Sequence, residues 1–403
     1  MTNQKTIDIV KSTAPVLKSH GEQITRVFYE ELFKHHPELK NMFNMTHQAT
    51  GNQPKVLAMT IIKYAEHIDQ LDMLTDTVNV IVQKHSSLDV RPEMYPIVGK
   101  YLLEAIKTVL GDMATAEILG AWEEAYQLLA QLFIGKEEKV YQDNEHKPGG
   151  FRGFADFQLI NKVKESETIT SLYFKPANDT PIPSHLPGQY VAISLDIPGE
   201  DHIHTRNYSL SDISNGEHLR LSVKRESCSP AGKVSNYLHD NLKVGDKVKM
   251  GMPSGDFVLQ KSEHPVLLIA GGVGITPLLP MYKSLLGTGR KTVLIQCTPN
   301  STTLPFQHEI KALDDPNHQH VIGFSNPLSS DIIDGTNVFE GFLTRSIIAE
   351  YIPSAESEVY YCGPKKFMQL VTQLLDDIGV PEKSRFFEFF GPADELRTEE
   401  HAQ

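Results

Sequence analysis

The spacing of apolar residues changes twice along this chain of 403 residues, and that change limits the folds open to it. Up to residue 141, apolar residues recur at three- and four-residue steps, the period of an amphipathic helix. Over residues 151–261 they alternate with polar residues, as in half-buried strands. From residue 262 onward, short apolar runs alternate with helical stretches, which is typical of a parallel sheet with crossover helices. We therefore expect a multidomain protein: all-α, then an antiparallel β-barrel, then α/β.

Local signals place the helices of the first region. Gly21 separates the first two apolar stripes, and Pro37 stops the second, because a residue before proline disfavours the helical conformation. Gly111 follows another stripe and is expected to end that helix. The stripes predict helices over residues 7–17, 24–36, 52–68, 71–85, 92–110 and 114–141.

His85 and Tyr95 fall on the apolar faces of two successive predicted helices, so both side chains are expected to point inward. An inward histidine at a helix end is either a core residue, whose ring nitrogens bond backbone carbonyls, or an axial ligand to a metal or haem iron. The core role is the more common one for an isolated histidine. The local pattern leaves both interpretations open.

The charge balance argues against several classes of partner. Asp and Glu total 51 against 38 Lys and Arg, a net charge of -13, so no basic surplus is available for nucleic acid or an anionic membrane. Residues 1–11 carry charges where a signal peptide needs an apolar core, and no apolar run approaches the span of a bilayer. The three cysteines lack the spacing of zinc or redox sites. We expect a cytoplasmic, monomeric protein with small-molecule substrates and no stable membrane association.

Residues 142–150 are polar and end in a proline and two glycines, which predicts an interdomain linker. The barrel region after it contains Arg206-Asn207-Tyr208-Ser209, which is expected to follow a turn and open a strand. Arginine can hold a phosphate through two parallel hydrogen bonds, and a tyrosine two residues on can stack on a planar ring, which suits a flavin nucleotide. Downstream, Gly232 leads into a helix whose free amides could receive a pyrophosphate.

A glycine-rich turn lies between a buried strand and a helix in the third region, as a dinucleotide site requires. It departs from the common fingerprint, because Pro277 stands where the third glycine would be. Cys362, Gly363 and Pro364 end another strand of the same predicted sheet. Ligands bind at the carboxyl edge of such sheets, so we expect the two turns to share a site.

The motifs RNYS, GKVS, GGVGITP and YCGP occur in the order and spacing of flavoproteins of the ferredoxin-NADP reductase type. The helical region resembles a globin, with Phe43 in the loop after the second major helix and His85 in the place of the proximal ligand. Together the two modules identify the chain as a member of the flavohaemoglobin family. The resemblance implies a globin haem domain over 1–141, a linker over 142–150, an FAD-binding barrel over 151–261 and an NAD(P)-binding domain over 262–403.

The resemblance also implies the haem site. Haem b would be held by His85, with Phe43 on the porphyrin face. Tyr29 and Gln53 would line the distal side, with the Tyr29 hydroxyl donating to iron-bound oxygen and Leu57 closing the pocket.

On the proximal side, Tyr95 and Glu137 would bond to the proximal histidine and give its imidazole more anionic character. Lys84 and Glu388 would tune the haem and flavin potentials. The expected cofactor-binding residues also include Tyr190, Arg206, Asn207, Tyr208, Ser209, Gly232, Val234, Ser235, Gly271, Gly272, Val273, Gly274, Ile275, Thr276, Cys362, Gly363, Pro364, Phe389, Phe390, Gly391 and Pro392.

The implied activity is that of a nitric oxide dioxygenase, in which NAD(P)H reduces FAD, FAD reduces haem, and nitric oxide and dioxygen yield nitrate. We expect NADH over NADPH, although NADPH is possible, because Thr298-Pro299-Asn300 at a strand end offers no arginine for a 2'-phosphate. Two other classes stay open. The chain could be a haem-based gas sensor or oxygen carrier, or a flavin reductase with a haem-free docking module.

Overall fold

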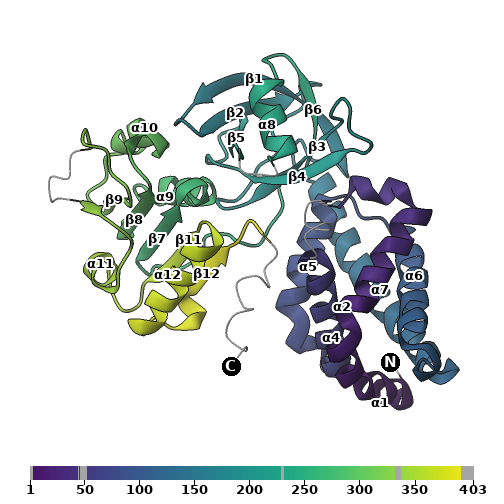
Figure 1. Ribbon diagram of the computed structural model, residues 1–403. Coiled ribbons are helices and arrows are strands. Elements are labelled where there is room, and N and C mark those ends of the chain that lie inside the picture. Colours follow the sequence, from purple (N-terminus) through teal and green to yellow (C-terminus); the bar gives the residue numbers. More distant parts are fainter. Residues whose placement is uncertain (1–2, 44, 46–51, 228–230, 332–336, 392–403) are drawn as a thin grey trace. The chain divides into compact units, whose positions relative to one another are not determined.

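The computed structural model describes residues 3–43, 45, 52–227, 231–331 and 337–391. The chain divides into two compact units. The first comprises Met1–Phe154 and Ser194–Arg206, and the second comprises Ala155–Ile193 and Asn207–Gln403. The helical part of the first unit, labelled in Figure 1, consists of α1 (Gln4–Ser12), α2 (Ala14–His35), η1 (Pro37–Asn41), α4 (Asn52–His67), η2 (Leu71–Leu74), α5 (Thr75–Ser87), α6 (Met94–Leu110), η3 (Gly111–Met113) and α7 (Ala116–Glu145).

The predicted helix break at Gly21 is wrong. The break comes at Thr13, and α2 then runs straight through Gly21. A Cβ added to Gly21 would lie 3.3 Å from the Cβ of Ala58, so the glycine sits where α2 and α4 pack closely. Tertiary packing therefore tolerates a residue that weakens an isolated helix.

Two further boundaries differ from the expectation. The stretch predicted as one helix over 71–85 begins with the separate 3-10 turn η2 before α5. At the other end of the unit, α7 extends to Glu145, so residues 142–145 of the expected linker are helical. Arg152 pairs with Glu138 at 2.8 Å and with Glu145 at 3.2 Å, which holds this last turn of the helix.

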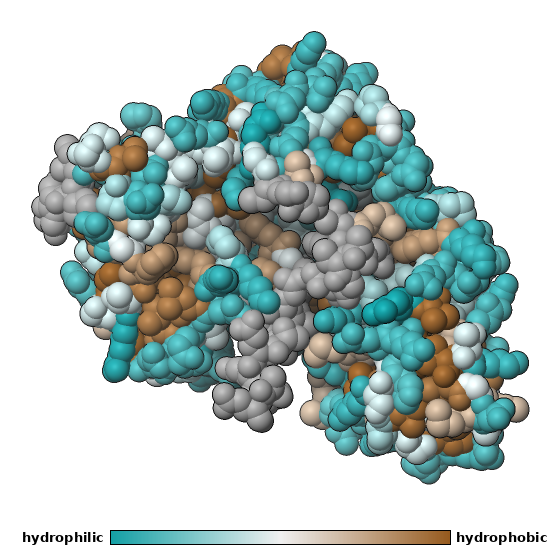
Figure 2. Space-filling view, in the orientation of Figure 1, coloured by the Kyte–Doolittle hydropathy of each residue, from teal (hydrophilic) through white to brown (hydrophobic). Residues whose placement is uncertain are grey.

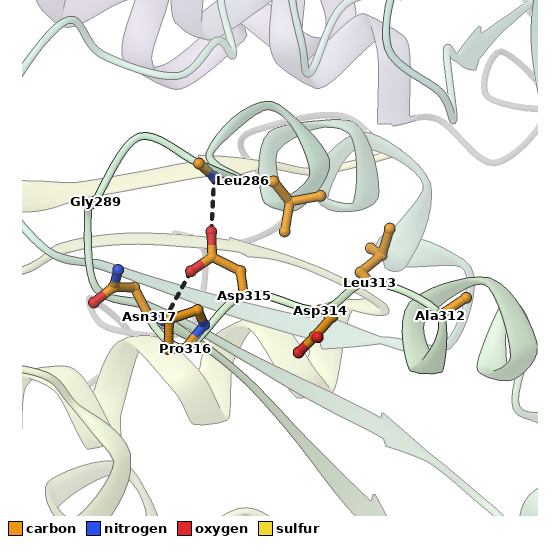
Figure 3. A pocket seen from close by; sticks show the side chains of 9 residues that line it. Leu286, Gly289, Ala312, Leu313, Asp314, Asp315, Pro316 and Asn317 are labelled. Atoms are coloured by element: carbon orange, nitrogen blue, oxygen red, sulfur yellow. Dashed lines mark hydrogen bonds between the residues drawn. The ribbon is translucent and has the colours of Figure 1, made fainter.

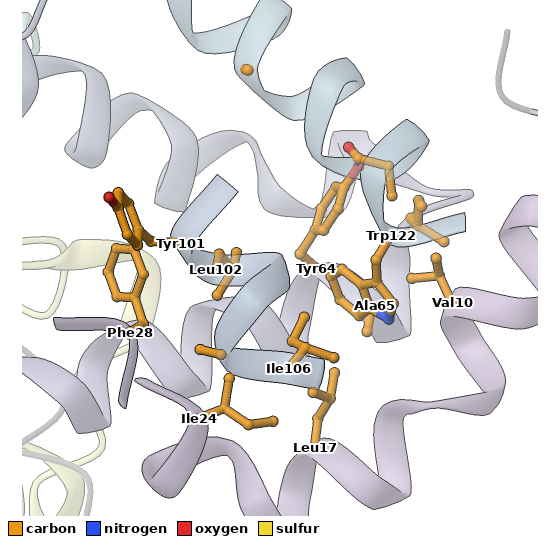
Figure 4. Close-up of a cluster of buried hydrophobic side chains, with 14 of the residues drawn as sticks. Val10, Leu17, Ile24, Phe28, Tyr64, Ala65, Tyr101, Leu102, Ile106 and Trp122 are labelled. Carbon is orange, nitrogen blue, oxygen red and sulfur yellow. Dashed lines mark hydrogen bonds between the residues drawn. The ribbon is translucent and has the colours of Figure 1, made fainter. Parts of the chain in front are cut away.

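The core of the helical bundle is built from the predicted apolar stripes (Figure 4). Polar atoms within it are satisfied by hydrogen bonds across helices. The Tyr64 hydroxyl donates to the Ala125 carbonyl at 2.8 Å, and the Trp122 indole donates to the Thr13 hydroxyl at 3.2 Å. These bonds tie α7 to α4 and to the start of α2, because an unpaired polar group would be costly here.

The second part of the chain begins with a six-stranded sheet in the order β4-β3-β6-β1-β2-β5. The pairings of β2 with β1 and with β5 are antiparallel. The Arg206–Ser209 motif closes its strand and does not open it, because β4 already begins at His204. The strands of this sheet and the helix α8 that follows β5 are β1 (Phe154–Lys164), β2 (Ile169–Pro176), β3 (Tyr190–Leu195), β4 (His204–Ser209), β5 (Leu219–Lys224), β6 (Lys247–Gly251) and α8 (Lys233–Asp240).

A second six-stranded sheet follows, in the order β10-β9-β8-β7-β11-β12, and its strands pair in parallel. Its central strand β7 is fully buried, with alternate residues packing against α9 on one face and against α12 on the other. The elements shown in Figure 1 are β7 (Val266–Gly271), η4 (Gly272–Gly274), α9 (Ile275–Ser284), β8 (Thr292–Thr298), η5 (Ser301–Thr303), α10 (Gln307–Lys311), β9 (His318–Phe324), β10 (Val338–Glu340), α11 (Arg345–Tyr351), β11 (Glu358–Cys362), α12 (Lys365–Asp377), η6 (Glu382–Ser384) and β12 (Arg385–Glu388). The predicted alternation of strands and helices is confirmed, and the short β10 adds an edge strand to it.

Figure 2 shows a face on which hydrophilic residues predominate, with smaller groups of hydrophobic side chains between them. Within the part of the chain that the structure describes, every helix is too short or too polar to cross a membrane.

Gly188 and Gly216 offer a matched test of how closely the second unit is packed. Both have positive φ, 102° and 72°, but a Cβ on Gly188 would lie 2.0 Å from the Phe257 carbonyl oxygen, whereas nothing lies within 4 Å of one on Gly216. We expect Gly216→Ala to cost about 1–2 kcal/mol from backbone strain alone. Gly188→Ala should cost about 2–5 kcal/mol because overpacking is added. Calorimetric unfolding of both variants checks this, and equal losses would contradict the packing argument.

Candidate functional site

Three helices bring His85, Tyr95 and Glu137 into direct contact. His85 lies near the C-terminal end of α5, Tyr95 at the start of α6 and Glu137 on α7. The Tyr95 hydroxyl donates to Glu137 Oε1 at 2.6 Å, and His85 Nδ1 lies 2.8 Å from the same oxygen. His85 Nδ1 is also 3.2 Å from the Tyr95 hydroxyl. The structure therefore assembles the hydrogen-bonded set that the family resemblance implied.

The electrostatics of this set fix the orientation of the His85 ring. Glu137 is only 2% exposed, so its carboxylate needs donors. Burial and then the hydrogen bond to Glu137 raise the pKa of Tyr95, so the phenol keeps its proton and donates. When His85 donates its Nδ1 proton, Nε2 carries the lone pair, which is the usual arrangement of a metal-binding histidine backed by a carboxylate. The donor set fits an axial ligand to haem iron.

Tyr29 lies among aromatic side chains on the predicted distal side. It is 7% exposed, and its ring centroid is 5.6 Å from that of Phe43, in an edge-on arrangement. Phe43 and Leu57 are partly buried and pack against the helical core. Gln53 lies in the first turn of α4 and is partly buried, and Lys84 is exposed on α5. The structure thus brings Tyr29 and Phe43 together in an apolar environment.

The predicted flavin residues lie on β3, on β4 and at the start of α8. Tyr190 opens β3, which neighbours β4 with its Arg206–Ser209 motif, made up of Arg206, Asn207, Tyr208 and Ser209. Gly232 is the N-cap of α8 and contributes no side-chain cap. The Ser235 hydroxyl donates to the Gly232 carbonyl at 3.3 Å, and Val234 is buried beneath the turn. The first-turn N–H groups of this eight-residue helix can donate hydrogen bonds to a phosphate.

The two glycine-rich turns of the parallel sheet touch each other. The first comprises Gly271, Gly272, Val273, Gly274, Ile275 and Thr276, at the carboxyl end of β7. A Cβ on Gly274 would lie 2.1 Å from the Cys362 carbonyl oxygen, so only glycine fits against the end of β11. Gly363 also lies against Gly271, with its Cβ position 3.1 Å from the Gly271 Cα, and Pro364 begins α12. The two turns therefore meet at the carboxyl edge of the sheet, and their role as a shared nucleotide site stays a prediction.

The C-terminal strand β12 completes this edge. It pairs with β11 so that Glu388 lies opposite Cys362. Burial, and then the charge of Glu388, raise the pKa of the Cys362 thiol well above its usual value, so the thiol stays protonated. Phe389 packs against the sheet and Phe390 is 46% exposed. The ring of Phe389 lies 2.5 Å from the Cβ position of Gly391, and the predicted residue Pro392 lies outside the described residues.

A cavity of about 550 Å³ lies at the opposite edge of this sheet, near the amino ends of β8 and β9 (Figure 3). Asp315 lines the cavity, and its carboxylate accepts hydrogen bonds from the Gly287 and Asn317 backbone N–H groups at 2.7 and 2.8 Å. None of the nine residues that line it was predicted as a site residue. Because ligands of such sheets bind at the carboxyl edge, this cavity does not mark the nucleotide site.

No pattern in the sequence indicated a group of four charged residues that lies between the two sheets. Asp212 and Arg220 come from the antiparallel part, and Lys283 and Glu309 come from the parallel part. They lie far apart in the sequence and follow no local motif. Phe306, beside Arg220, has a φ of 62°, which also could not be inferred from its residue type.

Family models match three successive regions of the chain. A globin model matches residues 26–132, an oxidoreductase FAD-binding domain matches residues 156–259, and an oxidoreductase NAD-binding domain matches residues 268–373. Two compared proteins named flavohemoprotein, from Halalkalibacterium halodurans and Bacillus anthracis, are 43% and 44% identical to this chain. Each alignment covers 98% of the chain, and 98% and 100% of the relative.

Solved structures with the same domains also resemble this chain. A flavohemoglobin from Malassezia yamatoensis, with bound FAD and haem, is 27% identical with a TM-score of 0.85 and covers 97% of this chain and 100% of its own. The FAD/NAD-binding domain of a nitric oxide dioxygenase from Vibrio cholerae is 33% identical with a TM-score of 0.54, over 59% of this chain and 99% of its own. The chain joins a globin region to FAD-binding and NAD-binding oxidoreductase regions, and the flavohemoprotein relatives align with it over almost their whole length. The chain therefore belongs to the flavohaemoglobin family.

Proposed function

We propose that this protein is an NAD(P)H-dependent nitric oxide dioxygenase, which uses dioxygen to convert nitric oxide to nitrate. The observation that carries the proposal is the hydrogen-bonded set of His85, Tyr95 and Glu137, joined in one chain to two oxidoreductase domains. An oxygen carrier needs electrons only to reverse occasional oxidation of its iron, whereas a dioxygenase consumes an electron at every turnover. The relation to the reductase part of the Vibrio cholerae nitric oxide dioxygenase also supports the proposal.

The residues present fit the cofactors that this reaction needs. His85 would hold haem through Nε2, Arg206 and the start of α8 would hold FAD, and the turn that begins at Gly271 would hold the nicotinamide nucleotide. When bound, FAD accepts a hydride and releases electrons singly, and haem supplies the iron at which dioxygen and nitric oxide react.

The protein's own contribution on the proximal side is made by Glu137. The buried carboxylate accepts a hydrogen bond from His85 Nδ1–H, which makes the imidazole a stronger electron donor through Nε2. Tyr95 donates to the same oxygen and so holds the carboxylate in place. The Tyr126 hydroxyl in turn donates to the Tyr95 backbone carbonyl at 2.6 Å, which anchors the start of α6 to α7.

On the distal side, Tyr29 supplies a hydroxyl in an apolar site. The aromatic rings of Phe28, Phe33 and Phe43 surround the tyrosine ring, at centroid distances of 4.8, 5.7 and 5.6 Å. These rings shelter the tyrosine ring and restrict its side chain, which favours a role for the phenol as a donor to a polar diatomic ligand. Leu57, on α4, adds an apolar contact to the same core.

The proposal is tested with the purified holoprotein. We expect its haem and flavin absorption bands both to change on addition of NADH under nitrogen, and nitric oxide to disappear on an electrode only when NADH and dioxygen are present. Rapid release of dioxygen without consumption of nitric oxide would instead indicate a carrier or sensor. A flavin band without a haem band would indicate a reductase with a docking module.

Tyr29→Phe tests the distal role. We expect dissociation of dioxygen to become about tenfold faster, because a hydrogen bond to the ligand is lost, and nitric oxide turnover to fall with it. Reduction of the flavin by NADH should be unchanged. Tyr64→Phe is the matched control, since it removes another buried phenol of the same unit, one that bonds the Ala125 carbonyl. Stopped-flow spectroscopy measures both rates, and equal effects of the two variants would remove Tyr29 from the mechanism.

Glu137→Gln tests the proximal role. The amide oxygen can still accept the hydrogen bond from Tyr95, so the fold should persist. The substitution removes the negative charge beside His85. We expect the iron–histidine stretching frequency in resonance Raman spectra to fall and turnover to drop about 10- to 100-fold. Glu138→Gln is the control, because the neighbouring glutamate pairs with Arg152 at the surface. An unchanged stretching frequency in Glu137→Gln would contradict the assignment.

The end of β8 tests nucleotide preference. Asn300 caps the short helix η5, and its side chain accepts the Thr302 amide and hydroxyl at 3.2 and 2.8 Å. Residues 298–303 contain no arginine for a 2'-phosphate. We expect kcat/KM for flavin reduction to be about tenfold or more higher with NADH than with NADPH. Comparable values with the two nucleotides would overturn this preference.

A further inference from the structure

Four charged side chains form a closed ring between the FAD-binding and NAD-binding regions. Arg220 Nη1 lies 2.7 Å from Glu309 Oε2, and Lys283 Nζ lies 2.7 Å from Glu309 Oε1. Lys283 also pairs with Asp212, whose carboxylate lies 3.8 Å from Arg220 Nε. The signs alternate around the ring. Asp212 and Arg220 belong to the FAD-binding match and Lys283 and Glu309 to the NAD-binding match. We call these four residues the charge ring.

The charge ring is sheltered from water. The exposed fraction of the side chain is 4% for Arg220, 14% for Asp212, 15% for Lys283 and 26% for Glu309. Burial alone would raise the pKa of Asp212, but the charges of Arg220 and Lys283 outweigh it and lower that pKa. The carboxylate is therefore ionised at neutral pH, and pairs at this depth are screened by salt much less than surface pairs are.

The Arg220 side chain is held on a strained support. Its guanidinium carbon lies 5.1 Å from the centre of the Phe306 ring, and Phe306 is 2% exposed with a φ of 62°. A bulky residue rarely adopts this left-handed region and persists there only where its surroundings impose it. Phe306 directly precedes α10, which carries Glu309, so this strained residue aims both the ring and the carboxylate at Arg220.

The arrangement of signs lowers the electrostatic cost of separating the two domains. Each domain contributes one cation and one anion. When the pairs across the domain boundary break, Arg220 can stay paired with Asp212, and Lys283 can stay paired with Glu309. Removal of a partner from a buried charge is normally very costly, because the remaining charge is unpaired. In this ring no charge loses its last partner, so the contact can open and close reversibly.

The position of the ring connects it to the chemistry. Lys283 lies near the end of α9, the helix that begins directly after the glycine-rich turn of β7. Asp212 follows the flavin motif of β4 by three residues. Whatever sets the distance between these two residues also sets the distance between the nucleotide turn and the flavin strand.

We propose that the charge ring positions the NAD-binding domain for hydride transfer to the flavin and opens reversibly to release the oxidised nucleotide. In that step the hydride leaves C4 of the reduced nicotinamide and bonds to N5 of the flavin, and the flavin takes up a proton. The four side chains are positioning residues, since they act through the two domains. The inference rests on the NAD(P)H-to-flavin step and is independent of the gas that the haem domain uses.

The experiment is anaerobic stopped-flow reduction of the flavin in the full-length holoprotein over a series of NADH concentrations. For Lys283→Met and Asp212→Asn, each alone, we expect the limiting rate to fall about tenfold while the apparent Kd for NADH changes less than about twofold. The double variant should be no slower than the slower single variant, because both remove the same contact. Additive losses would overturn the proposal. The absence of dioxygen and nitric oxide separates this test from that of the proposed function.

Arg290→Met is the matched control for a purely structural effect. Arg290 pairs with Glu358 at 3.2 Å, and both side chains are at least as buried as those of Lys283 and Asp212. Arg290 also donates to the His264 carbonyl at 2.9 Å and so holds the chain that leads into β7, but neither Arg290 nor Glu358 belongs to the charge ring. We expect this variant to lower the unfolding temperature and leave the limiting rate of flavin reduction unchanged. Lys283→Arg keeps the positive charge, so this variant should retain most of the limiting rate of the unaltered protein. If Arg290→Met slows flavin reduction as much as Lys283→Met does, or if Lys283→Met acts by weakening NADH binding, the positioning role is wrong.

Discussion

The buried carboxylate of Glu137 is the constraint on which the helical unit depends. A carboxylate that is almost fully buried is tolerated only when strong donors satisfy it. Its donors, Tyr95 and His85, come from two other helices, so α5, α6 and α7 must meet at one point. The same contact turns the imidazole so that Nε2 faces away from the carboxylate. Stability of the bundle and orientation of the candidate iron ligand therefore have a single physical cause.

In the parallel sheet, the close approach of two backbone segments constrains the structure, as the buried carboxylate of Glu137 does in the helical unit. Gly274 touches the carbonyl of Cys362, and Gly363 touches Gly271, so two turns from neighbouring strands form one surface. The Phe367 ring lies 2.7 Å from the Cβ position of Gly271 and 2.5 Å from that of Gly363, so the two glycines leave room for this ring as well as for the backbone contact. Pro277, which departs from the common fingerprint, is buried in the first turn of α9, where proline is tolerated.

Sequence periodicity predicted most elements of both units, and its failures have physical reasons. The break expected at Gly21 is absent because packing against Ala58 stabilises a continuous α2. The extension of α7 beyond Tyr141 is held by Arg152, which lies outside the helix. The Arg206–Ser209 motif closes its strand because pairing with β3 begins earlier than the turn residues indicate. In each case a contact from elsewhere in the chain outweighs a local preference.

The sequence by itself determined the three successive architectures, the inward faces of His85 and Tyr95, and the order of the nucleotide-binding turns, because periodicity and glycine positions act locally. Only the tertiary structure decided which charges meet. Glu137 reaches His85 across 52 positions, and Arg220 reaches Glu309 across 89. Local sequence carries no record of such pairs, since an ionised side chain is stabilised by whichever partner the fold delivers to it. The charge ring therefore became visible only in the folded chain, whereas the pairing of Glu137 with His85 was implied by the family resemblance and not by any local pattern.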